Sequence, residues 1–273
     1  MNRTPVERTK LILSNLPLIW DFYNYFWAFK RKTVVFRGYY PTREEAEAAC
    51  PKEKPTGYNQ EVLATHPEPS QLTARQSIGG FDRRDYPLLF WLARVLGEGR
   101  TVFDLGGNVG LGYYAYERFI SYPAGLSWLV CEISQICKRG ELLAKERGIT
   151  NLTFTEDFSL CENRDLLITC GTLQCLPWTL GSLVAKLKAK PRHILIHRVP
   201  LTEGPTFYTV QNIGYAFAAY RFQGKGELFD SLTALGYKLI DSWKDSREAF
   251  IPFHRERSIQ GYSGAYFKLD ASA

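Results

Sequence analysis

Histidine and cysteine are scarce in this sequence, and neither forms a cluster of the kind that binds a metal ion. The 273-residue chain has no HxxxH or HxH pair among its four histidines, His66, His193, His197 and His254. Its six cysteines form no CxxC pair, which argues against a zinc site and against a disulfide framework. We therefore expect no metal site, reduced thiols and a cytoplasmic protein.

A long uninterrupted apolar run is also missing. Residues 11–29, LILSNLPLIWDFYNYFWAF, are apolar and aromatic but are interrupted by Asn15, Pro17, Asp21 and Asn24. They fit neither a transmembrane helix nor a signal peptide, because both need a nearly continuous apolar core.

Positive charge is concentrated at the N-terminus. Residues 1–40 contain seven Lys/Arg and two acidic residues, so they hold +5 of the net charge of +6. We expect this segment to pack on the main domain as helices; the alternative is a peripheral contact with the anionic inner face of a membrane. The basic residues form no clustered stripe, so nucleic acid is not an expected partner.

The chain is long enough for one large domain with an appendage. Residues 1–75 hold the basic segment, a short helix predicted over residues 41–50, and Pro-rich loops, so we interpret them as a helical N-terminal extension. Residues 76–273 are more regular and are predicted to form the main domain.

The main domain alternates apolar strands with helical patterns. Helices are expected over residues 81–99, 111–121, 134–148, 179–189 and 224–236, and strands over 100–105, 126–133, 151–158, 164–176 and 192–201. This alternation predicts a doubly wound α/β sheet. Two strands at 237–243 and 261–269 have no helix between them, which predicts a closing hairpin with one antiparallel strand at the edge.

A glycine-rich turn follows the first strand of this domain, in VFDLGGNVGLGYYAYERF (102–119). Such a turn brings backbone N–H groups to the carboxyl end of the strand and lets a ligand approach closely. The literal GxGxxA match, Gly110–Ala115, begins six residues after Asp104, inside the expected helix, so it is badly placed for a dinucleotide. Asp104 would repel a pyrophosphate and would suit a ligand with an ammonium group.

Two further strands of the predicted sheet end in acidic side chains. Glu132 closes the second strand, where a carboxylate can accept both hydroxyls of a ribose. Asp157 and Phe158 close the third strand, where they could contact the edge and face of an adenine; the alternative for Asp157 is a helix N-cap. Together these groups fit a nucleoside with a positively charged tail, such as S-adenosylmethionine.

These residues resemble the class I S-adenosylmethionine-dependent methyltransferases, whose first motif is an acidic residue before a glycine-rich turn and whose seven-stranded Rossmann-like sheet ends in an antiparallel hairpin. From about residue 73 to 269 the chain is similar, more closely, to a family of bacterial methyltransferases associated with surface-polysaccharide gene sets. The similarity lies in the order of the segments YPLLFWLARV, VFDLGGNVGLGYY, WLVCE, LLITCGTLQCLPW, ILIHRVPLTEGPTFYTVQNIG and YRF.

The resemblance implies roles for particular residues. The methionine part of the cofactor would be wrapped by the glycine turn, with Asp104, Gly106, Gly107, Asn108 and Gly110. Glu132 would bind the ribose, and the floor beside the sulfonium would be formed by Gly171, Thr172 and Gln174. The chain departs from the narrower family at His197, where an aspartate is more common, and its GGNVG spacing differs from the usual GxG.

Methyl transfer to a hydroxyl or an ammonium group requires a proton to leave, and a neutral histidine is the usual base. His197, at the end of the fifth predicted strand beside Arg198, and His254, in the loop between the last two strands, are the candidate catalytic residues. The alternative for His197 is a structural hydrogen bond within its strand.

Residues 202–222 are rich in Tyr and Phe, with Gln211 and Asn212 among them. This composition suits a glycan, a lipid-linked or an aromatic acceptor, and it equally suits an insertion that packs on its own domain. The sequence thus predicts an S-adenosylmethionine-dependent methyltransferase that O-methylates a small-molecule or glycan-type acceptor in polysaccharide biosynthesis. A nicotinamide-dependent oxidoreductase and a non-catalytic module that docks on a membrane through residues 1–40 are the alternatives.

Overall fold

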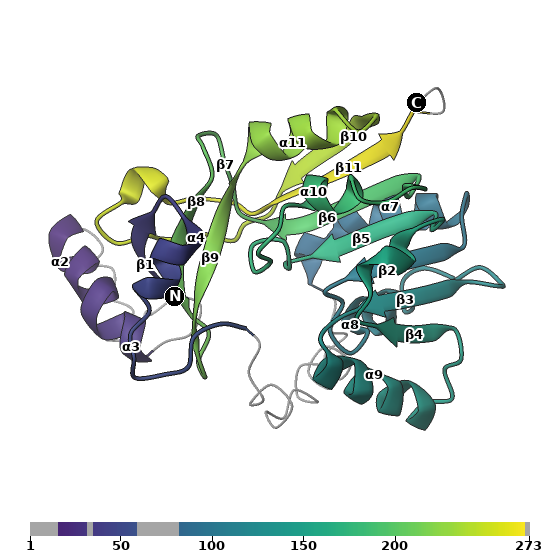
Figure 1. Cartoon of the computed structure of the whole chain (residues 1–273), viewed down its shortest axis with the longest axis horizontal. Coiled ribbons are helices and arrows are strands. Elements are labelled where there is room, and N and C mark those ends of the chain that lie inside the picture. The colour runs from purple at the N-terminus through teal and green to yellow at the C-terminus, as the bar shows by residue number, and fades with distance from the viewer. Residues whose placement is uncertain (1–15, 32–34, 59–81, 271–273) are drawn as a thin grey trace, which may run out of the picture.

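The computed structural model describes residues 16–31, 35–58 and 82–270, which form a large and a small β-sheet lying side by side (Figure 1). The large sheet has seven strands in the order β10-β11-β6-β5-β2-β3-β4. Their bounds are Thr101–Leu105 (β2), Ser127–Cys131 (β3), Leu152–Thr155 (β4), Leu166–Cys170 (β5), His193–Val199 (β6), Tyr237–Lys244 (β10) and Ser263–Leu269 (β11).

The five neighbouring strands β6, β5, β2, β3 and β4 are parallel to one another. Strand β11 is antiparallel to both of its neighbours, β6 and β10. The predicted doubly wound, Rossmann-like, seven-stranded sheet with a C-terminal hairpin is therefore confirmed. One detail of the prediction was wrong. The antiparallel strand β11 lies one position in from the edge, because the hairpin folds back so that β10 becomes the edge strand.

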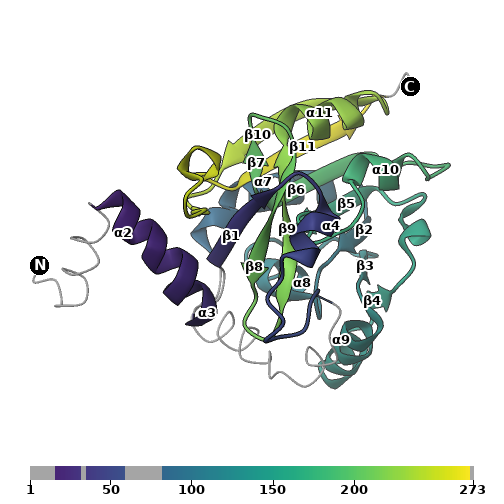
Figure 2. The ribbon, with the colours of Figure 1, turned by 60° about the vertical axis from the view of Figure 1, so that its left-hand side comes forward.

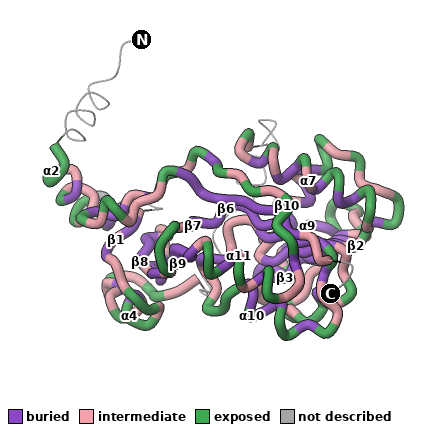
Figure 3. The backbone as a smooth tube through the Cα atoms, turned by 90° about the horizontal axis from the view of Figure 1, so that it is seen from above, coloured by how far each residue is buried: buried purple, intermediate pink, exposed green. Residues whose placement is uncertain are grey.

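Both faces of the large sheet are covered by helices, because successive strand residues are apolar and point to opposite sides. Val102 and Trp128 pack on one face with α7 (Tyr86–Leu96), α8 (Leu111–Tyr116) and α9 (Ser134–Glu146). Phe103 and Leu129 pack on the other face with α10 (Leu180–Val184) and α11 (Lys225–Thr233). In Figure 3 the inner strands are accordingly buried, while the helices are exposed on their outer sides.

The small sheet joins two segments that are far apart in the sequence. Its strand order is β1-β8-β9-β7, with β1 at Val35–Tyr40, β7 at Leu201–Thr202, β8 at Phe207–Asn212 and β9 at Phe217–Gly224. β1 pairs antiparallel with β8, and β8 pairs antiparallel with β9. The aromatic segment 202–222 thus supplies strands of this sheet, and its partner strand comes from the segment we had interpreted as a helical extension.

Helices from the N-terminal segment cover the small sheet. α4 (Arg43–Ala48) packs on β8 and β9, while α2 (Pro17–Phe22), η1 (Tyr23–Ala28) and α3 (Phe29–Arg31) follow one another beside β1 (Figure 2). Phe29 stacks on Phe217 with ring centroids 5.1 Å apart, and Asn212 donates a hydrogen bond to the Phe29 carbonyl (2.6 Å). The described part of the N-terminal segment therefore packs on the rest of the protein. Residue 75, where we divided the chain, lies outside the described residues.

None of the helices among the described residues combines the length and the hydropathy needed to cross a bilayer.

Candidate functional site

The glycine turn after β2 is a tight connection in which the glycine positions tolerate no side chain. Gly106 and Gly110 have φ angles of +75° and +89°, which L residues rarely adopt. A Cβ atom on Gly106 would collide with the side chain of Thr172, and one on Gly110 would lie 2.8 Å from Leu152. Gly107 has an ordinary φ, but a Cβ there would overlap the carboxylate of Asp104. The glycines therefore hold Asp104, the turn and the loop after β5 in close contact.

Asp104 is a buried carboxylate without an ionic partner among the described residues. Its side chain accepts one hydrogen bond, from the indole nitrogen of Trp128 (3.1 Å), and the residue is 4% exposed. Burial raises the pKa of Asp104 to about 7, because a charge in this position loses its water without gaining a counter-ion. A cation that entered the turn would favour the ionised form.

Glu132 follows β3 and connects it to the glycine turn. Its carboxylate accepts hydrogen bonds from the backbone N–H groups of Asn108 (3.2 Å) and Ile133 (3.1 Å). Burial raises its pKa above the usual range, although both hydrogen bonds act in the opposite direction. Those bonds fix the carboxylate at the end of its strand, where one side remains open to a ligand.

A cavity of about 640 Å³ lies between the large sheet and the elements around the small sheet. This volume is within the range of small-molecule sites. From the large sheet, the lining includes the strand-end residues Gly106, Asn108, Glu132, Gly171 and Thr172. From the small-sheet side, it includes Arg43, Tyr58 and Tyr215. The cavity therefore opens at the carboxyl ends of the parallel strands, where ligands bind in doubly wound sheets.

A second, smaller cavity of about 90 Å³ adjoins the first. The two share the lining residues Gly106, Asn108, Leu111 and Cys170. The smaller cavity also presents a carboxylate and a guanidinium group, from Asp104 and Arg198. It thus offers one group of each charge beside the glycine turn.

The structure brings most of the predicted cofactor residues together at these cavities. Gly106, Asn108, Glu132, Gly171 and Thr172 line the larger one, and Asp104 and Gly107 line the smaller one. Gly110 is outside the lining of both cavities and is the N-cap of α8, and Gln174 is buried with its amide nitrogen donating to the Arg198 carbonyl (3.4 Å).

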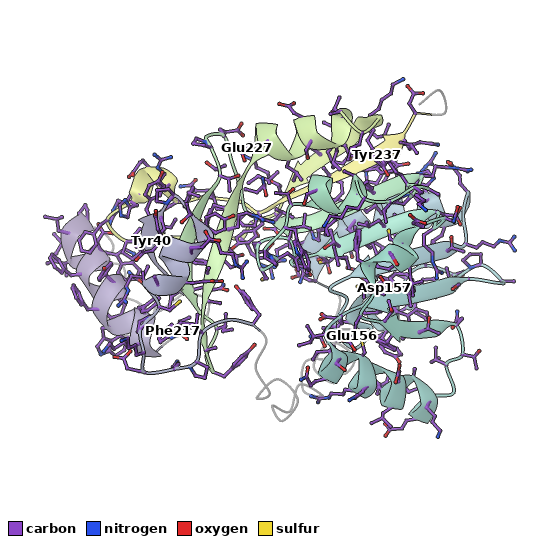
Figure 4. The ribbon with its side chains drawn as sticks, viewed as in Figure 1. Tyr40, Glu156, Asp157, Phe217, Glu227 and Tyr237 are labelled. Carbon is purple, nitrogen blue, oxygen red and sulfur yellow. The ribbon has the colours of Figure 1, made fainter. Side chains whose placement is uncertain are left out.

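Asp157 and Phe158 have structural contacts instead. The Asp157 side chain is exposed and caps the short helix η3 (Phe158–Cys161) by accepting from the Ser159 N–H (2.8 Å) (Figure 4). Phe158 packs edge-on against Phe103 with ring centroids 5.6 Å apart. The N-cap alternative therefore describes Asp157, and neither residue belongs to the lining of the two cavities.

The interpretation of His197 as a base at the rim is not supported, because its ring is fully buried and both of its nitrogens are occupied. Nδ1 accepts a hydrogen bond from the indole N–H of Trp243 (3.0 Å), so the ring proton is on Nε2, which donates to Asp85 (3.1 Å). No lone pair is left to take a proton from an acceptor. The structural alternative fits this residue.

His254 also lies away from both cavities. It precedes η4 (Arg255–Arg257) beside the small sheet, with its ring centroid 5.8 Å from that of Tyr39.

The small-sheet side of the larger cavity contains residues that our sequence interpretation missed, among them Arg43 and Tyr58. Both lie in the segment interpreted as an extension, and no local pattern marks them as ligand-binding.

These missed residues connect the small sheet to the loop that follows β5. Tyr58 donates to the Gln211 side chain (2.9 Å), and Arg43 donates from Nη1 to the Cys175 carbonyl (3.2 Å). Arg221, on β9, donates from Nη2 to the carbonyls of Leu173 and Trp178. The loop between Gly171 and Trp178 is therefore held by a residue of helix α4 and a residue of strand β9.

No protein-family model matches the chain, and no curated protein matches it in sequence. Solved structures of similar fold include the 1,6-didemethyltoxoflavin-N1-methyltransferase of Burkholderia thailandensis, with a TM-score of 0.48 and 20% identity over 77% of this chain and 88% of that chain. The magnesium protoporphyrin IX methyltransferase of Synechocystis PCC 6803 gives 0.46 and 15% over 73% and 84%. The N-terminal domain of EvdMO1 gives 0.44 and 14% over 69% and 82%. All three contain bound S-adenosylhomocysteine, and at these identities the likeness concerns the fold alone.

Proposed function

We propose that this chain is an S-adenosylmethionine-dependent methyltransferase. The observation that carries the proposal is the set of charged groups around the two adjoining cavities. Glu132 is placed at a strand end where a carboxylate can accept both ribose hydroxyls. In the smaller cavity, Asp104 can bind an ammonium group. Arg198 lines the same cavity, and although its Nε and Nη2 atoms donate to Asp85 and Asp82, its guanidinium group can also donate to the carboxylate of an α-amino acid.

The same charges argue against a dinucleotide. A pyrophosphate needs backbone N–H groups and a helix N-terminus without a carboxylate nearby. Here Asp104 lies beside the turn, and the Asn108 N–H is already donated to Glu132. The nicotinamide alternative is therefore disfavoured on electrostatic grounds.

When bound, S-adenosylmethionine supplies a methyl group activated by a positively charged sulfur. The chain's own contribution is to hold an acceptor in line with that group and to exclude water. Tyr58, Trp178 and Tyr215 line the part of the larger cavity away from the glycine turn. Their rings suit a planar or sugar-like small molecule. O-methylation, a glycan or lipid-linked acceptor and a polysaccharide setting remain proposals.

Calorimetric titration with S-adenosylmethionine, S-adenosylhomocysteine and NADH tests this function. We expect both sulfur compounds to bind and NADH not to bind. Glu132→Gln should weaken S-adenosylhomocysteine binding by about 10- to 100-fold, because hydrogen bonds to a charged group contribute about 1.5–3 kcal/mol. Glu162→Gln is the matched control, since Glu162 is bonded to the Lys188 N–H outside the cavities. Binding of NADH alone would contradict the proposal.

We also propose that the N-terminal segment contacts a membrane surface, as a cytoplasmic protein on the inner face would. Leu18, Phe22 and Phe26 follow one another at a spacing of four residues and are 69%, 54% and 57% exposed. Aromatic and aliphatic side chains next to a basic segment suit an anionic lipid interface.

Sedimentation with phosphatidylglycerol vesicles tests this contact. We expect binding by the full chain and its loss in a variant with Leu18, Phe22 and Phe26 all replaced with serine. A variant with serine at Leu142 and Leu160, which are also exposed but lie outside this segment, should bind as the parent does. The contact is refuted if the two variants sediment equally with phosphatidylglycerol vesicles. It is also refuted if the full chain sediments equally with neutral phosphatidylcholine vesicles.

A further inference from the structure

The acceptor side of the larger cavity is built around two guanidinium groups. Arg43 lines the cavity directly, and its side chain is 18% exposed. Arg221 lies behind the loop that lines the cavity and is 1% exposed. Both donate to carbonyl groups of the loop between Leu173 and Trp178. The positive charge of this wall therefore comes from helix α4 and from strand β9.

The two charges are incompletely neutralised. Arg221 forms no ion pair with a carboxylate among the described residues, and its Nε atom is buried without a hydrogen-bond partner there. Arg43 donates from Nε to Glu47 (2.8 Å), but this glutamate is 40% exposed to solvent, and the Nη2 atom of Arg43 has no described partner. Burial of a charge without full compensation is costly, so an anion at this wall would be stabilised.

The positive charges of Arg43 and Arg221 both influence the Cys175 side chain, which lines the cavity. Burial raises the pKa of the Cys175 thiol to about 11, while a hydrogen bond with Tyr58 and then the charges of Arg43 and Arg221 act to lower it, and Glu132 acts to raise it. At the other end of the site, Asp104 and Glu132 provide negative charge beside the glycine turn. The carboxylates of the site therefore lie beside the glycine turn, where Arg198 is already paired with Asp82 and Asp85, and the incompletely neutralised guanidinium groups lie on the wall that would face the acceptor.

We infer that the acceptor is a small molecule with a carboxylate, that Arg43 binds this carboxylate, and that one of its oxygens receives the methyl group. The inference rests on the proposed function and deepens it. In the reaction an oxygen lone pair forms a bond to the methyl carbon while the carbon–sulfur bond breaks, and that electron pair stays on sulfur. The products are a methyl ester and a neutral thioether, so no proton is transferred.

This acceptor class agrees with the titratable groups of the site. A carboxylate is already ionised at neutral pH and needs no general base. Neither His197 nor His254 lies in the cavity, and Glu132, the one carboxylate that lines it among the described residues, already accepts two backbone N–H groups. Arg43 can in addition present a planar pair of donors, the geometry that carboxylates prefer.

The test compares benzoate with benzamide, which have the same ring and nearly the same size but differ in charge. Each is titrated into the protein saturated with S-adenosylhomocysteine. We expect benzoate to bind about tenfold more tightly, because a charge-assisted hydrogen bond is stronger than a neutral one. Arg43→Gln should remove this preference, and Arg43→Lys should retain part of it. Arg94→Gln, which removes the same charge from the exposed side of α7, should change nothing.

The results separate this inference from the proposed function. Failure of S-adenosylhomocysteine itself to bind would refute the methyltransferase proposal before benzoate is added. If S-adenosylhomocysteine binds but benzoate shows no advantage over benzamide, or keeps it in Arg43→Gln, the carboxylate acceptor is wrong. Unchanged melting temperature and S-adenosylhomocysteine affinity in Arg43→Gln would show that the lost preference is not a folding defect.

Discussion

Replacement of Asp104 with asparagine is expected to abolish S-adenosylmethionine binding and, at the same time, to stabilise the unliganded protein. The carboxylate is buried with one hydrogen bond, from Trp128, and its pKa is raised to about 7. Asparagine can still accept the Trp128 hydrogen bond but has no charge to bury, and it cannot attract an ammonium group. Most substitutions that abolish binding by disrupting the fold would instead lower stability.

The pH dependence of this effect has a definite sign. The folded-state pKa of Asp104 is above the ordinary value of 3.8, so between about pH 4 and pH 7 the folded protein binds more protons than the unfolded chain. The unliganded protein should therefore lose stability as the pH rises through this window. Above pH 7 the advantage of Asp104→Asn should reach at most about 4 kcal/mol, since one pKa unit corresponds to about 1.4 kcal/mol. Urea unfolding at pH 5 and pH 8 measures the difference.

Ligand binding should follow the opposite trend. Below about pH 7 Asp104 is increasingly protonated, and a proton must leave before an ammonium group can be bound. Calorimetry should therefore show the affinity for S-adenosylhomocysteine falling by up to about tenfold for each pH unit below 7. In Asp104→Asn no binding should appear at any pH in this range. If the affinity of the parent protein for S-adenosylhomocysteine is independent of pH, Asp104 does not contact the ammonium group of the ligand.

Asp165 provides a matched control at the other end of the same sheet. It precedes β5 and accepts hydrogen bonds from the N–H groups of Arg100 (2.8 Å) and Thr101 (2.9 Å). Burial alone would raise its pKa, but these bonds outweigh burial and the pKa is lowered. Asp165→Asn should therefore destabilise the protein and leave cofactor binding intact. If both variants change stability in the same direction, our account of Asp104 fails.

Replacement of Asp85 with alanine is expected to destabilise the protein by about 3–5 kcal/mol, the usual effect of leaving a buried charge unpaired. Asp85 is 3% exposed and accepts from His197 Nε2 (3.1 Å) and Arg198 Nε (3.1 Å). Without it the His197 N–H loses its acceptor, and among the described residues the Arg198 guanidinium keeps only the contact with Asp82 (3.2 Å). Because Arg198 lines the smaller cavity, the affinity for S-adenosylhomocysteine should fall as well.

Asp82→Ala is the control for this network. The Asp82 side chain is 23% exposed, against 4% for Asp85, so its removal should cost clearly less, about 1 kcal/mol. Burial alone would raise the pKa of Asp85, but His197 and Arg198 outweigh it and the pKa is lowered. The stability from Asp85 is thus present above about pH 4 and is lost as the pH falls through its lowered pKa. Chemical unfolding that shows equal losses of stability in Asp85→Ala and Asp82→Ala would contradict this account of the network.

The sequence contains local signals for the large sheet and for the glycine turn. Apolar runs bounded by helical patterns predict the parallel strands, because each strand is buried on both faces. Asp104 and Glu132 could be identified because a residue at a strand end has a known position relative to the sheet edge. Gly106 and Gly110 could be identified because a strand-to-helix turn of this length needs positive φ angles.

The remainder of the site depends on contacts between segments that are distant in the sequence. Residues 35–40, VFRGYY, are rich in residues that favour strands, but their position beside the N-terminal helices hid the pairing with residues 207–212. Arg43 and Tyr58 reach the cavity only through that pairing. His197 could not be distinguished from a rim residue, because the sequence does not reveal that Trp243 and Asp85 occupy its two nitrogens.

The pairing of β1 with β8 also has a consequence for how the protein is synthesised. The side chain of Thr209 contacts the backbone of Arg37 across a separation of 172 residues. At about 5–20 residues per second, a ribosome needs roughly 10–30 seconds to make the intervening chain. Throughout that time β1 has no partner strand, and an unpaired edge is prone to associate with other chains. The β1 strand should therefore need protection by a chaperone until residues 207–212 have been made.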